Sequence, residues 1–220
     1  QGVLRWLYRQ DIETPIDAQA FLLALEGLAK AFVLEEGGGA TYEDVVHRED
    51  RFFVPQTNES AMVRALPKKL VYGRARLIDF NFLDYLLWLK AKAENSANTQ
   101  EWRTFEFTST RRSVEHLHPQ TELFTGNAWV DADLHAFGNL CLVSHAMNSR
   151  LGNSGPEDKF KQLISEKHSQ SLKVFSMHLE FSERGAWAAD IAMRQHATKI
   201  FALMQCAFEA DGLIELTVAQ

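Results

Sequence analysis

Apolar side chains recur three or four positions apart in three long stretches of the chain, and this spacing predicts helices. The stretches cover approximately residues 15–34, 77–95 and 184–208. Thr14 and Pro15 give the first stretch a helix start, because proline fits the first position of a helix. The second stretch is rich in aromatic side chains and predicts a helix that is buried in a core.

Shorter segments fill the space between these helices. Residues 41–48 follow the glycine run 37–39 and predict a short helix. Residues 51–67 are interrupted by prolines and predict a loop with at most one or two helical turns. Pro156 and the two acidic residues after it predict the start of a further helix, because acidic side chains complement the positive end of the helix dipole.

Two segments in the middle of the chain alternate between polar and apolar residues and predict strands. They are residues 104–108 and 112–117, and Pro119 stops the second. Residues 140–143 are a short apolar run that suits a buried strand. The chain therefore reads as helices, then a strand–loop–strand–helix segment, then helices again.

This order predicts an α+β fold that is mostly helical. We expect three regions: a helical region at 1–101, a strand-containing core at 102–172, and C-terminal helices at 173–220 that pack on this core.

Composition narrows the class of protein. The chain has 220 residues, of which 46% are hydrophobic and 24% charged, as in an ordinary globular protein. No apolar stretch is long enough to span a bilayer, and no signal peptide is evident. Cys141 and Cys206 cannot form a disulfide framework, so we expect a cytoplasmic protein. The net charge of −6 argues against a generally basic protein that coats nucleic acid.

One group of polar residues in the central region contains the residue types that a catalytic site needs. Glu115 and Asn148 supply the oxygen ligands that Mg²⁺ prefers. His116 could take a proton from an attacking water, since an imidazole titrates near neutral pH. Asn139 could hydrogen-bond the far ring nitrogen and orient the imidazole. These are the parts that a one-metal phosphodiesterase needs.

The same residues carry a family resemblance. The motifs are Glu115-His116-Leu117-His118-Pro119-Gln120, Phe137-Gly138-Asn139-Leu140 and Asn148-Ser149. With the aromatic helix upstream and Trp187, Ile191 and Arg194 downstream, roughly residues 70–205 resemble the C-terminal nuclease domain of GmrSD-type modification-dependent (type IV) restriction enzymes and anti-phage proteins. This domain is of the HNH, or His-Me finger, type. Many HNH enzymes have aspartate at the position of Glu115, a change that a flexible Mg²⁺ shell can absorb.

The resemblance implies a fold and an activity. It implies an embedded ββα-metal (HNH-like) finger and a DNA endonuclease or nickase that uses Mg²⁺ or Mn²⁺, with His116 as general base. Family members commonly carry an N-terminal sensor domain. Because the chain begins at Gln1 rather than methionine, we expect such a domain upstream, with region 1–101 in part a linker to it.

Four further residues are candidates for contacts with DNA phosphates: His118, Arg112, Asn153 and Lys159. Three of them have a structural alternative. His118 could cap the loop, Asn153 could be a turn residue, and Lys159 could be a solvated charge. His145 lies three residues before Asn148 and is a rival ligand.

The sequence is also compatible with two other functions. The finger could be catalytically silent and bind DNA or a protein partner. Alternatively, His116, His118 and His145 could form a site for Zn²⁺ or Ni²⁺.

Overall fold

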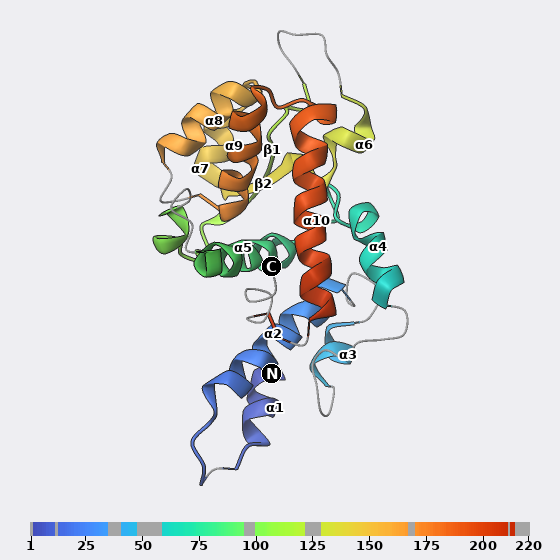
Figure 1. Cartoon of the computed structure of the whole chain (residues 1–220), viewed down its shortest axis with the longest axis vertical. Helices are drawn as coiled ribbons and strands as arrows, with labels where there is room; N and C mark the ends of the chain where they lie inside the picture. Colours follow the sequence, from blue (N-terminus) through green and yellow to red (C-terminus); the bar gives the residue numbers. More distant parts are fainter. Residues whose placement is uncertain are drawn as a thin grey trace. The chain divides into compact units, whose positions relative to one another are not determined.

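A computed structural model describes residues 2–11, 13–34, 41–47, 59–94, 100–121, 129–166, 170–210 and 212–213. These residues form two compact units (Figure 1). The first comprises Gln1–Leu66 and Gln205–Gln220, and the second comprises Pro67–Met204. Among the described residues, none of the helices has the length and apolar character that crossing a membrane requires.

The first unit is helical. Its helices are α1 (Gly2–Tyr8), α2 (Ala18–Leu34), α3 (Tyr42–Val46) and the first part of α4 (Glu59–Lys69). Two buried charged side chains of α2 bind the chain that follows the last helix. Glu26 accepts a hydrogen bond from the amide of Leu213 at 3.0 Å, and Lys30 donates to the carbonyl of Ala210.

The structure confirms the helices expected at 15–34 and 41–48 and corrects the start of the first. Helix α2 begins at Ala18 because the Asp17 carboxylate accepts from the amides of Gln19 and Ala20 and so caps the helix. At α3, Thr41 and Asp44 cap each other's backbone amides in a capping box.

The expected loop at 51–67 is wrong for its described part, because α4 occupies residues 59–69. The reason is burial on one face. Val63, Leu66 and Leu70 fall at helical spacing and are each at most 6% exposed. Pro67 is tolerated because it lies in the last turn of this helix. Residues 51–58 lie outside the described part of the chain.

The second unit contains the only sheet among the described residues, a two-stranded antiparallel pair. Strand β1 (Arg111–His116) pairs with β2 (Leu140–Ser144) so that Glu115 faces Cys141 and His116 faces Leu140. The helices of this unit are α5 (Leu77–Glu94), η2 (Gln100–Arg103), α6 (Asp131–Leu134), η3 (Phe137–Asn139), α7 (His145–Leu151), α8 (Pro156–Ser165), α9 (Leu172–Arg184), the π-helix η5 (Ala189–Met193) and α10 (Arg194–Glu209), which continues into the first unit.

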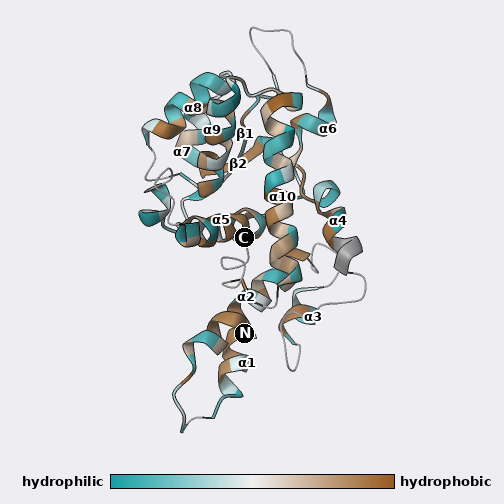
Figure 2. Ribbon diagram, viewed as in Figure 1, coloured by the Kyte–Doolittle hydropathy of each residue, from teal (hydrophilic) through white to brown (hydrophobic). Residues whose placement is uncertain are grey.

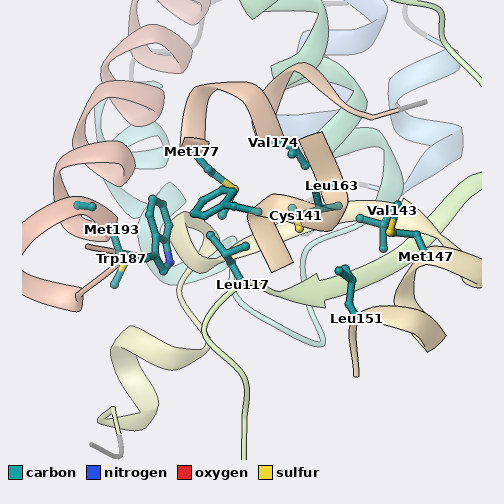
Figure 3. Close-up of a cluster of buried hydrophobic side chains, with 12 residues drawn as sticks. Leu117, Cys141, Val143, Met147, Leu151, Leu163, Val174, Met177, Trp187 and Met193 are labelled. Carbon is teal, nitrogen blue, oxygen red and sulfur yellow. The ribbon is translucent and has the colours of Figure 1, made fainter. Parts of the chain in front are cut away.

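The core of the second unit lies against the sheet. Side chains from β2, α7, α8, α9 and η5 meet there, among them Cys141, Met147, Met177, Trp187 and Met193 (Figure 3). The outer side of α8 is hydrophilic (Figure 2) and carries exposed Glu157, Asp158 and Lys161. The mixed fold, mostly helical with a small sheet, is therefore α+β as expected.

Four elements of the second unit match the sequence. Helix α5 fills the expected range, β1 and β2 fall on two of the three predicted strands, and α8 begins with Pro156. Residues 104–108 are not a strand. Instead, the Phe105 ring packs against the Phe107 ring, and the Arg111 guanidinium lies over the Phe105 ring.

The helix expected at 184–208 begins later than predicted, at Ala189, and consists of η5 followed by α10. Helix α9 ends at Arg184, and Gly185 has the left-handed conformation (φ +74°) that terminates a helix. The break lets Trp187, which is 5% exposed, enter the core before η5 and α10 begin.

Two buried groups join α5 to α9 and to η3. The Asp84 carboxylate of α5 accepts from the amide of Lys173 at 2.9 Å, at the start of α9. The Lys173 ammonium donates to the carbonyls of Phe137 and Leu140, which flank Asn139. Burial lowers the pKa of Lys173 to about 7.

We predict that stability of the second unit falls below pH 6.5, in part because of His196. This side chain is fully buried, and burial lowers its pKa well below the ordinary value of 6.5. Below pH 6.5, His196 therefore binds a proton in the unfolded chain but stays neutral in the folded chain. The contribution of the neutral His196 to the free energy of unfolding is complete above pH 6.5. As the pH falls below this value, the free energy of unfolding decreases by up to about 1.4 kcal/mol per pH unit.

Urea unfolding at pH 7.5 and 5.5 tests this, with His196→Phe as the variant that keeps a ring and removes the titration. We expect the variant to lose less stability between the two pH values than the parent. An equal loss in both proteins would show that His196 does not contribute.

Candidate active site

His116 is the centre of a small cluster of rings at the end of β1. Its side chain is 5% exposed, and its Nε2 lies 3.1 Å from Nδ1 of His135. The Tyr72 ring packs on both imidazoles, with centroid distances of 4.4 Å to His116 and 5.5 Å to His135. The amide nitrogen of Gln120 lies 3.4 Å from each ring nitrogen of His116.

The backbone fixes this arrangement from two sides. His135 is the C-terminal cap of α6, and its carbonyl accepts from the amide of Tyr72 at 2.9 Å. The neighbouring residues Val71 and Ala136 form an isolated antiparallel bridge. The segment after α4 is thereby held beside the segment that leads into β2, and the two imidazoles meet.

The environment keeps His116 neutral. Burial lowers its pKa to about 4, and the electrostatic interactions with His135 and Lys159 act in the same direction. An unprotonated imidazole carries a free lone pair at neutral pH, so this ring is able to accept a proton.

Glu115 forms a buried ion pair. The Lys159 ammonium of α8 is 2.5 Å from Oε1 of Glu115 and also donates to the carbonyl of His116 at 2.7 Å. Lys159 is 1% exposed and Glu115 12%. Burial raises the pKa of Glu115, and the Lys159 charge pulls it in the opposite direction. Lys159, expected at a DNA phosphate, is therefore placed inside the protein against the carboxylate.

Asn139 has a different position from the one expected. Its Oδ1 accepts from the amide of His118 and from the Trp187 indole, and its Nδ2 donates to the carbonyls of His118 and Leu134. These four bonds use its full capacity, so it does not orient the His116 ring. The expected interaction fails because the carboxamide is directed at the backbone; His135 occupies the position beside the imidazole.

The close packing of Asn139 depends on its neighbour. A Cβ at Gly138 would lie 2.8 Å from Cβ of Ala197 and 2.9 Å from Sδ of Met193. Glycine at this position lets η3 approach η5 and α10, and so brings the carboxamide of Asn139 to Trp187.

Asn148 lies on α7, directly after β2. Ser144 caps this helix by accepting from the amide of Met147. Oδ1 of Asn148 is buried and has no hydrogen-bond partner among the described residues. A buried amide oxygen without a partner is costly, and a hard cation is one group that can satisfy it.

The remaining predicted residues are spread over the unit. His118 is buried, and its ring stacks on Trp129 at 4.1 Å, while Arg112 and Asn153 are exposed. His145 is exposed at the start of α7. No three His, Cys, Asp or Glu side chains gather as metal ligands within the described ranges. His116, His118 and His145 therefore do not form the Zn²⁺ or Ni²⁺ site that we considered.

Sequence reasoning missed His135 and Tyr72. Neither residue lies in a motif, and their contact with His116 depends on the backbone bridge between two separate segments. The concentration of histidines in the central region was the only signal available for His135.

Comparison with known proteins identifies the family. The family model for the C-terminal domain of GmrSD restriction endonucleases matches residues 68–198. Searches of curated proteins and of solved structures gave no match. The matched range covers more than half of the chain and includes β1, β2, α7 and the whole His116 cluster. The chain therefore belongs to the family of GmrSD restriction endonuclease C-terminal domains.

Proposed function

We propose that this chain is an HNH-type endonuclease or nickase that hydrolyses phosphodiester bonds of DNA with Mg²⁺ or Mn²⁺. The observation that carries the proposal is the buried, neutral His116, paired through Nε2 with His135 and placed directly after the ion-paired Glu115 in β1. Membership of a restriction endonuclease family supports DNA as the substrate and phage defence as the setting. We further propose a cytoplasmic protein with a sensor domain upstream.

The order of elements supports the HNH type. Strand β1 ends in Glu115 and His116, β2 returns antiparallel to it, and α7 follows directly with Asn148. Helix α7 contacts both strands. This is the strand–strand–helix order that a ββα finger requires.

His116 is the proposed general base. If its Nε2–H donates to Nδ1 of His135, the lone pair lies on Nδ1, 3.4 Å from the Gln120 amide nitrogen. An attacking water that takes the place of this amide can give its proton to Nδ1. His135 then has the role of a positioning residue: it holds the ring and its tautomer, as the third member of a catalytic triad does.

Glu115 and Asn148 are the residues that would hold a metal ion. The partnerless Oδ1 of Asn148 fits a hard cation. A carboxylate can bind one cation at each oxygen, so with Lys159 on Oε1 of Glu115, Oε2 is the oxygen that would bind the metal ion. When bound, the ion would neutralise charge that develops on the phosphate. The Lys159 ammonium holds the carboxylate in place from the core side.

The second candidate is a silent DNA- or protein-binding module. The ion pair between Lys159 and Glu115 favours it, because this carboxylate already has a positive partner. The two candidates differ in one measurable property, which is whether His116 and a metal are needed for DNA cleavage.

We predict that His116→Ala reduces cleavage of supercoiled plasmid by roughly 100- to 10,000-fold, the contribution of a general base. Cleavage by the parent should require Mg²⁺ or Mn²⁺ and stop in EDTA. The matched control is His145→Ala, which removes an exposed histidine from α7 and should cut like the parent. Metal-dependent cutting that is unchanged in His116→Ala would overturn the assigned base; absence of cutting by the parent would favour the silent module.

We also predict that His135→Leu lowers the cleavage rate roughly tenfold to a hundredfold, as removal of a residue that orients a catalytic imidazole does. His135→Asn should retain most activity, because its Oδ1 can accept from His116 near the position of Nδ1. The rates should be compared at saturating DNA, so that a change in binding is not mistaken for one in catalysis. Equal rates for the two variants would contradict the role of His135 as hydrogen-bond acceptor.

A further inference from the structure

We propose that the segment Lys68–Arg74, here called the cationic segment, binds the DNA backbone and directs the strand to His116. The inference rests on the proposed function, because it assigns the surface on which the substrate lies. Three basic residues, Lys68, Lys69 and Arg74, stand within seven positions of each other and surround Tyr72. The phosphate-binding residues expected from the sequence did not include this segment.

The first argument is that these charges are free. Six exposed cations of the second unit have an acidic partner: Lys90 with Glu94, Arg150 with Glu166, Lys161 with Glu157, Arg184 and Lys199 with Glu180, and Arg194 with Asp133. Within the described part of the chain, no acidic side chain forms an ion pair with Lys68, Lys69 or Arg74. Unpaired cations gathered in one segment of an acidic protein are available to an anionic ligand.

The second argument is position. Tyr72 lies in the middle of the cationic segment, and its ring centroid is 4.4 Å from that of His116. The amide of Tyr72 donates to the carbonyl of His135, and Val71 is bridged to Ala136. The basic residues are therefore at most four positions from a residue that contacts the candidate base.

The third argument is that the segment is ordered before any ligand binds. Lys68 and Lys69 form the last turn of α4, and the amides of Arg74 and Ala75 both donate to the carbonyl of Val71. Gly73 adopts a left-handed conformation (φ +79°) that completes this turn. A preformed turn loses little conformational freedom on binding, which favours affinity.

The chemistry of the segment fits a phosphodiester backbone. Lysine and arginine neutralise successive phosphates and fix the register of a strand without reading its sequence. Tyr72 is 45% exposed and offers a ring to a sugar or an unpaired base next to the scissile position. Asp133, close to His135 in sequence, is neutralised by Arg194 at 2.6 Å and so opposes the approach of an anion less.

The test is a binding measurement that does not depend on cleavage. Fluorescence anisotropy of a labelled 30-base-pair duplex is recorded in EDTA over a range of KCl concentrations. The test variant carries Lys68→Gln, Lys69→Gln and Arg74→Gln. The control variant carries Lys90→Gln, Arg150→Gln and Lys161→Gln, which removes the same amount of charge from exposed cations that have acidic partners.

We expect the test variant to bind DNA at least about tenfold more weakly than the parent. The slope of log Kd against log salt should fall by roughly 0.9 for each phosphate that the variant no longer neutralises. The control variant should stay within about threefold of the parent, and circular dichroism melting should show that both variants fold. Because cleavage is measured separately with Mg²⁺, loss of the nuclease function and loss of this surface are distinguishable.

Three outcomes would overturn the proposal. They are a test variant that binds like the parent, a control variant that loses as much affinity as the test variant, and a parent that does not bind DNA. The second outcome would mean that total charge, and not this segment, sets the affinity.

Discussion

The four hydrogen bonds of the buried Asn139 carboxamide join three parts of the chain that the site requires. They bind the backbone after β1 through His118, the end of α6 through Leu134, and the segment after α9 through the Trp187 indole. Lys173 also holds η3 in place, since its ammonium donates to the carbonyls of Phe137 and Leu140. With both ends of the loop held, His116 at the end of β1 and His135 after α6 are brought within 3.1 Å.

Burial of polar groups then sets the chemistry of the site. The same low-dielectric surroundings that lower the pKa of His116 raise that of Glu115, and a single ammonium, that of Lys159, lies against both residues. The result is a neutral imidazole at His116 and, at the preceding residue of β1, a carboxylate whose charge is partly compensated. The Oδ1 of Asn148, a predicted metal-ligand atom, is buried and has no hydrogen-bond partner among the described residues. In our account, metal and substrate complete a site that the fold has already arranged.

The elements and motifs with strong local signals were predictable from the sequence. Helix α5, the two strands and the start of α8 follow from periodicity and capping residues, and the family follows from the spacing of Glu115, Asn139 and Asn148. The sequence predictions that were wrong concern features that depend on tertiary packing. Residues 104–108 alternate like a strand but have no neighbour to pair with among the described residues, and the break at Gly185 exists because Trp187 enters the core. The contact of His135 with His116 depends on a bridge between distant segments, so no local pattern records it.

The central claim is that His116 is a neutral imidazole whose Nε2–H points to His135 and whose Nδ1 carries the lone pair, 3.4 Å from the Gln120 amide nitrogen. Long-range ¹H–¹⁵N correlation of histidine-labelled protein at pH 7 reports which ring nitrogen carries the proton, and His116→Gln assigns the signals. Our account predicts one protonated nitrogen, Nε2, and an unprotonated Nδ1. A doubly protonated ring, or a proton on Nδ1 alone, would contradict it.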